Sequence, residues 1–180
     1  MKKILLFAMM NLCVAGAFAQ KGKPVSGQGS AINGNVGLGL RLTPDGGGFT
    51  GKFFLNRYVA IEAQLNAGGI FQFAGESFNA VGLVEYHIAL PDPSWRIYFG
   101  GGLHAGVYDR GRYWDDDDLR WRDGGRPLFG IDAIAGVEYA FKNIPLGLSA
   151  DVKPAINFAP DVDFFPHNIV GVSARFYLGR

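Results

Sequence analysis

The chain has 180 residues, of which 27 are glycine, 14% are aromatic and 18% are charged, and its formal net charge is +1. The charged fraction lies below the ~25% that is usual for soluble domains, and abundant glycine with abundant aromatics is typical of turn-rich β structure and argues against disorder. A charge this close to neutral gives no reason to expect a nucleic-acid partner. The length favours a single domain.

The first nineteen residues have the three parts of a secretory signal peptide. Two lysines form a positive start, residues 4–18 form an apolar stretch, and Ala17-Phe-Ala19 is an A-x-A cleavage site. The apolar run is shorter than the ~18 residues that a membrane-spanning helix needs, which disfavours an anchoring helix. Cys13, the sole cysteine, lies inside this segment and lacks the preceding small residue of a lipoprotein signal. We therefore predict cleavage after residue 19 and a mature chain with neither disulfide nor lipid.

Residues 20–30 form a short Gly/Ser/Lys linker, and from residue 31 apolar residues recur at every second position. This repeat is that of an extended strand, whose successive side chains point to opposite faces. The last segment shows it best, because Val170, Val172, Ala174, Phe176 and Leu178 alternate with small or polar residues. The same alternation predicts eight strands, at residues 32–42, 49–55, 59–66, 78–88, 95–107, 129–139, 146–153 and 170–178.

The lengths of these segments favour strands that cross a membrane. The number of strands is even, and each is near the ~9–11 residues that a tilted membrane strand requires. Short turns on one rim and longer loops on the other are typical of an outer-membrane barrel. The chain shows this tendency, with short turns at 56–57, 91–94 and 142–145 and long connections at 68–76, 109–126 and 157–166.

The polar faces of the strands carry five cations and five anions. If the apolar faces were a soluble core, in a sandwich or a soluble barrel, these charges would face water and their balance would need no explanation. If the apolar faces meet lipid, the charges share a narrow lumen, which eight strands make just wide enough to fill with side chains, and they must be paired. We therefore predict an all-β fold, an eight-stranded antiparallel up-and-down transmembrane β-barrel, over residues 31–180. Its interior charge network consists of Arg41, Lys52, Glu62, Glu85, Arg96, Asp132, Glu138, Asp151, Lys153 and Arg175.

Two local features refine the predicted barrel. Pro154 lacks a ladder donor, so we expect it to mark a bulge or to lie above the membrane. Aromatic residues are expected in a girdle at each membrane interface. The short-turn rim has Tyr58, Trp95, Tyr139, Phe141 and Phe176, and the long-loop rim has Phe49, Phe78, Phe129 and Phe158.

The signal peptide, the eight alternating strands and the ending with the eighth strand resemble the small outer-membrane barrels typified by OmpX and the transmembrane domain of OmpA. The resemblance implies a monomer in the bacterial outer membrane that contacts lipid and lipopolysaccharide. It also implies assembly by the barrel-insertion machinery, which reads the last strand. In this chain Gly171, Phe176 and Leu178 would carry that assembly signal, and Gly179-Arg180 follows in place of the terminal aromatic residue usual in the family.

The sequence predicts no catalytic, cofactor or metal site. His87 and His104 fall on the interior face, where a histidine satisfied by the polar network is far commoner than a catalytic one. His167 and Ser173 have opposite parity on the last strand and cannot form a dyad, which leaves only a pairing of Ser149 with His104. We expect no enzymatic activity, and a lipid A acyltransferase or deacylase is the alternative.

The connection 109–126 is the candidate interaction surface. Its four consecutive aspartates lack the alternating ligand spacing of a Ca²⁺-binding loop, so local Asp–Arg pairing is the favoured interpretation. Two flanking tryptophans could serve adhesion or contact with lipopolysaccharide. We expect a structural or surface-interaction role, with a narrow conduit for small hydrophobic solutes, lined by the interior of strand 78–88, as the alternative. The residues assigned to this loop are Trp114, Asp115, Asp116, Asp117, Asp118, Arg120, Trp121 and Arg122.

Overall fold

A computed structural model describes residues 35–44, 46–68, 77–108, 112–115, 120–123, 126–159, 162–164 and 169–178. The predicted signal peptide and linker lie outside these residues. No helix within the described ranges is long and apolar enough to cross a membrane. The strands are β1 Val36–Thr43, β2 Gly46–Phe54, β3 Val59–Gly68, β4 Ser77–Ala89, β5 Trp95–Tyr108, β6 Arg112–Asp115, β7 Arg120–Asp123, β8 Arg126–Ala140, β9 Leu146–Val152, β10 Ala155–Ala159, β11 Asp163–Phe164 and β12 Val170–Leu178.

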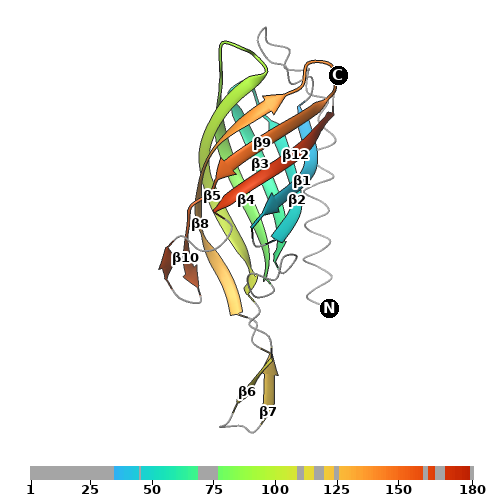
Figure 1. The fold of residues 1–180 in the computed structure, drawn as a ribbon. Helices are drawn as coiled ribbons and strands as arrows, with labels where there is room; N and C mark the ends of the chain where they lie inside the picture. Colours follow the sequence, from blue (N-terminus) through green and yellow to red (C-terminus); the bar gives the residue numbers. More distant parts are fainter. Residues whose placement is uncertain are drawn as a thin grey trace.

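Eight of the described strands close an antiparallel, up-and-down barrel (Figure 1). Neighbours around the barrel follow the chain in the order β1, β2, β3, β4, β5, β8, β9 and β12, and β12 then pairs with β1. The closing seam runs from the pair Val36–Leu178 to the pair Leu42–Val172. Closure satisfies the backbone polar groups along the strand edges, as a hydrocarbon environment demands. The predicted all-β barrel is confirmed, and each predicted strand corresponds to one of these eight.

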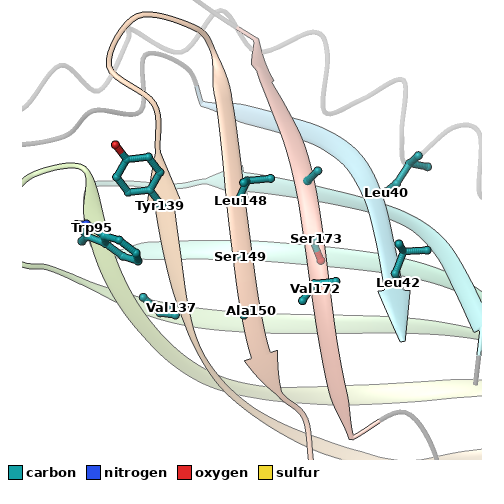
Figure 2. A pocket seen from close by; sticks show the side chains of 11 residues that line it. Leu40, Leu42, Trp95, Val137, Tyr139, Leu148, Ser149, Ala150, Val172 and Ser173 are labelled. Carbon is teal, nitrogen blue, oxygen red and sulfur yellow. The ribbon is translucent and has the colours of Figure 1, made fainter. Parts of the chain in front are cut away.

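The apolar faces of the strands form the outer wall and the polar faces form the lumen. Along β12, Phe176 is 51% exposed, whereas its neighbours Arg175 and Tyr177 are 1% and 4% exposed. The outer wall includes an apolar depression across β1, β5, β8, β9 and β12 (Figure 2). Its lining includes the side chains of Leu40, Leu42, Trp95, Tyr139, Leu148 and Val172.

Aromatic side chains contact one another near both rims. Near the short turns, the rings of Trp95 and Tyr139 lie 4.9 Å apart, and that of Phe141 lies 5.0 Å from Tyr139. Near the long connections, the rings of Phe129 and Phe158 lie 6.4 Å apart. Such pairs keep large amphipathic or apolar rings at the two ends of the wall, where membrane interfaces favour them.

Two connections that the alternation left irregular contain short strands. Within 109–126, β6 and β7 form a two-stranded sheet of their own, placed beyond the end of the barrel in Figure 1. Within 157–166, the end of β10 is followed by β11, and the two strands pair with each other. The sequence interpretation missed β6 and β7 because every residue in these two segments is charged or aromatic, so no apolar repeat marks them.

Pro154 lies between β9 and β10 without a bulge. The pairs Ala135–Val152 and Asp132–Ala155 belong to one uninterrupted register, and the carbonyl of Pro154 accepts a hydrogen bond from the Ala133 amide. The register shifts later, between Asn157 and Ala159. Of the two expectations for Pro154, the bulge is wrong, because the proline only removes one donor and the strand continues beyond it. The position above the membrane stays a prediction.

Candidate functional site

Every barrel strand contributes a charged side chain to the lumen. The ten residues of the predicted charge network all face inward, and none is more than 7% exposed. Burial of an ion costs on the order of several kcal/mol unless hydrogen-bond and ion-pair partners replace its hydration shell. The arrangement of partners therefore decides whether this lumen is stable.

Lys52 of β2 is the shared cation of three glutamates. Its Nζ lies 2.7 Å from Glu85 Oε2, 3.0 Å from Glu62 Oε2 and 3.4 Å from Glu138 Oε2. The same ammonium lies 4.2 Å from the centre of the Tyr98 ring, whose face attracts cations. Lys52 thus connects β2 with β3, β4, β5 and β8 at one point.

Arg175 of β12 neutralises the same cluster from the other side. Its Nη2 donates to Glu62 Oε1 at 2.7 Å, its Nη1 to Ser149 Oγ at 2.8 Å and its Nε to Thr50 Oγ1 at 3.2 Å. Glu62 Oε1 also accepts hydrogen bonds from Thr50 and Gln64. A buried carboxylate with this many donors has strong, charge-assisted partners in place of bulk solvent.

A second ion pair joins β1 to β9. Arg41 Nη1 and Nη2 donate to the two oxygens of Asp151, each at 2.6 Å, which is the bidentate geometry of strong guanidinium–carboxylate pairs. Tyr98 Oη also donates to Asp151 at 3.2 Å, and Arg41 Nη1 lies 3.4 Å from Ser173 Oγ. The pair bridges strands that are not neighbours, since β12 lies between them.

A third cluster lies nearer to the long connections. Asp132 Oδ1 accepts from Lys153 Nζ at 2.8 Å, and its Oδ2 lies 2.7 Å from His104 Nδ1. His104 Nε2 lies 2.9 Å from Asn157 Oδ1. This chain of contacts fastens β10, which carries Asn157, to β5 and β8.

The charges are balanced within each part of the lumen. Opposite charges are therefore neutralised locally, which offsets the cost of desolvation. The half toward the short turns holds three cations and three anions, and the half toward the long connections holds two of each. The first group is Lys52, Arg96, Arg175, Glu62, Glu85 and Glu138, and the second is Arg41, Lys153, Asp132 and Asp151.

Glycines make room for the largest lumen side chains. A Cβ at Gly171 would overlap the guanidinium of Arg41, and a Cβ at Gly136 would overlap the ring of Tyr98. The large side chains therefore lie flat against the backbone of neighbouring strands. The same relation holds for Gly37 and Gly147 with Tyr177, and for Gly130 with His104.

Sequence reasoning did not assign the two lumen tyrosines to the network. Tyr98 is 2% exposed and bonds Asp151, and the hydroxyl of Tyr177 donates to Glu138. Both tyrosines lie between the apolar positions of their strands, and this alternation could have indicated that their side chains point into the lumen. Tyr98 also packs with Val81, Leu83 and Ile134 in an apolar part of the lumen.

The candidate catalytic pairs are not assembled among the described residues. Ser149 Oγ accepts from Arg175, whereas His104 contacts Asp132 and Asn157. Ser173 Oγ lies within reach of Arg41 instead. His167 lies outside the described residues.

The remaining assigned residues are divided between the hairpin and the last strand. Trp114 is opposite Trp121, Asp115 is opposite Arg120 and Tyr113 is opposite Arg122 in the register of β6 and β7. Asp116, Asp117 and Asp118 lie outside the described residues. Of the residues assigned to the assembly signal, Phe176 and Leu178 face outward and Gly171 lies beneath Arg41 in the lumen.

No family model matches the chain, and no curated protein sequence matches it significantly. The structure is similar to the crystal structure of the N-terminal β-barrel domain of Pseudomonas aeruginosa OprF. The TM-score is 0.58 and the sequence identity 15%, over 78% of this chain and 93% of that chain. The chain has the fold of an outer-membrane β-barrel domain. The outer-membrane barrel class predicted from the alternation is thereby confirmed at the level of fold.

Proposed function

We propose that the chain is a small outer-membrane barrel with a structural and surface-interaction role, closed in its interior by the charge network. The observation that carries this proposal is the burial of the ten charged lumen side chains, together with the ion pairs that join strands across the lumen. A lumen filled in this way leaves the outer wall and the long connections as the surfaces for function. The proposed partners are outer-membrane lipid, lipopolysaccharide and, during biogenesis, the barrel-insertion machinery, and the protein is proposed to be monomeric.

A closed lumen predicts very low conductance. We expect planar bilayers containing the purified protein to show no regular ion-conducting steps at neutral pH, because Lys52, Arg175 and Arg41 hold carboxylates on facing strands. The conduit alternative is disfavoured because the apolar residues Val81 and Leu83 are covered by other lumen side chains. Regular steps, or protein-dependent entry of a small hydrophobic dye into vesicles, would contradict the closed barrel.

The β6–β7 hairpin is the proposed interaction surface. In the register of β6 and β7, Trp114 is opposite Trp121, which brings the two tryptophan positions together on neighbouring strands. Large aromatic residues carry much of the binding energy of interfaces. We expect the double variant Trp114→Ala, Trp121→Ala to bind lipopolysaccharide at least about tenfold more weakly, a change of ~1.4 kcal/mol.

The measurement is a titration of the protein, held in lipid nanodiscs, with purified lipopolysaccharide. The matched control is Tyr113→Ala, which removes an aromatic ring from the same hairpin at the position before Trp114. Unchanged heat-modifiable gel mobility in all variants shows that the barrel remains folded. Equal binding by the wild type and the double variant would remove the hairpin from the proposed function.

A further inference from the structure

β10 and β11 form a hairpin at the end of the barrel wall, in which β10 continues the register of β9 along β8. β9 pairs with β12 as far as the pair Val152–Val170, followed by a backbone bond from Lys153 to Ile169. Beyond that point β10 pairs with β8 on one edge and with β11 on the other. We call residues 155–159 and 162–164 the β10–β11 flap. Figure 1 shows β10 at the side of the barrel, near the end that carries the long connections.

The flap has one apolar face. In its register Ile156 is opposite Phe164, which places these two side chains on one side, and Val162 lies two residues before Phe164. Phe158 faces the same side although the register shifts between Asn157 and Ala159, because its ring lies 6.4 Å from that of the outward-facing Phe129. Phe158 is 48%, Val162 66% and Phe164 61% exposed. Asn157 lies on the other side, where it is buried and contacts His104 in the lumen.

The apolar face of the flap continues the outer wall of the barrel. Ile156 pairs with Ile131 of β8, and the ring of Phe158 lies 6.4 Å from that of Phe129. Ile131 and Phe129 are themselves outward-facing and exposed. A connecting hairpin in water would not keep three large apolar side chains exposed on a single face. The continuous apolar surface therefore indicates that the flap meets the same environment as the outer wall of the barrel.

We propose that the β10–β11 flap is a lipid-binding element, whose Phe158, Val162 and Phe164 insert among acyl chains of the outer leaflet. The proposal rests on the proposed outer-membrane location and goes beyond it, because it assigns lipid contact to a hairpin that extends past the last pair between β9 and β12. Aromatic and aliphatic side chains at the edge of the hydrocarbon are favoured at membrane interfaces. The Asn157–His104 contact holds the flap at the barrel mouth while its opposite face meets lipid.

Single spin labels can test the environment of the flap. The chain has one cysteine, Cys13, so a Cys13→Ser background permits labels at Val162→Cys and Phe164→Cys. Leu148→Cys on the outer wall is the lipid control, and Asn143→Cys in an exposed turn is the water control. In phosphatidylethanolamine–phosphatidylglycerol vesicles we expect the oxygen-to-nickel-chelate collision ratio at both flap positions to match that at Leu148→Cys. The collision ratio at both flap positions should exceed the ratio at Asn143→Cys several-fold.

The outcomes separate the two proposals. Flap labels that behave like the Asn143→Cys label, beside a lipid-exposed Leu148→Cys label, would show a flap in water and overturn the inference alone. Flap labels shielded from both reagents would mean a protein cover, which also overturns it. A Leu148→Cys label with the collision ratio of a water-exposed site would instead contradict the proposed membrane barrel. Heat-modifiable gel mobility confirms folding of each labelled variant before the measurement.

Discussion

Replacement of Lys52 with methionine is expected to lower the free energy of unfolding by about 3–5 kcal/mol, the usual loss when one partner of a buried ion pair is removed. Three carboxylates lie within 3.4 Å of the Lys52 ammonium, and methionine keeps most of the side-chain length but no charge. Glu85 and Glu138 would then lose their shared cation while they remain buried. The measurement is the urea midpoint of the barrel refolded in detergent micelles, followed by heat-modifiable gel mobility.

The matched control for this variant is Lys142→Met. Lys142 lies 3.5 Å from Asp92 in the short turns, and both side chains are more than half exposed, so we expect a loss of at most about 1 kcal/mol. At acidic pH the difference in the free energy of unfolding between Lys52→Met and the wild type should become smaller. Once Glu85 or Glu138 is protonated, it no longer repels the neighbouring carboxylates. Equal losses for the two lysine variants would contradict a special role for the lumen cation.

The sequence predicts which side chains share the lumen but not which of them meet. Alternation places Arg41 and Asp151 on polar faces, yet they are 110 residues apart and come from strands that do not pair. Their contact depends on the stagger of the strands around the closed barrel, which a period of two does not encode. The same limit applies to Lys52 and Glu138, which meet across the lumen from β2 and β8.

The alternation of apolar residues does not predict the short strands outside the barrel, and the reason differs from strand to strand. β6 and β7 have four residues each, all of them charged or aromatic. β11 has two residues, too few to show any period. The apolar face of the flap emerges only when β11 is paired with β10, because Val162 and Phe164 are separated from Ile156 and Phe158 in the chain. Pairing, rather than composition, therefore reveals the surface that we assign to lipid.

Local neutrality of the lumen explains why the proposed functions lie on the outside of the barrel. Arg41 is satisfied by Asp151 and Lys153 by Asp132, as Lys52 and Arg175 are by glutamates, so a ligand entering the lumen would have to replace strong, desolvated ion pairs. Surfaces that project from the rim carry no such cost. The hairpin and the flap are two such surfaces.

The Gly171→Ala substitution is expected to separate Arg41 from Asp151. A methyl group at position 171 would occupy the place of the Arg41 guanidinium, and both ends of this pair are fully buried. We expect the urea midpoint to fall by the equivalent of about 1–3 kcal/mol, because the guanidinium must shift out of its bidentate contact with a buried carboxylate. Gly82→Ala is the matched control, since its added methyl group meets no atom within 4 Å on the outer wall. That variant should change stability by less than about 1 kcal/mol.

A double-mutant cycle distinguishes this cause from a general intolerance of alanine at position 171. In a background of Arg41→Met and Asp151→Leu the guanidinium and its carboxylate are both absent. Gly171→Ala should then cost no more than about 1 kcal/mol, so the coupling energy of the cycle carries most of the original loss. If Gly171→Ala lowers the free energy of unfolding by the same amount in that background, the added methyl group must clash with the backbone of β12 itself. The close approach of Arg41 would then not be the reason for glycine at position 171.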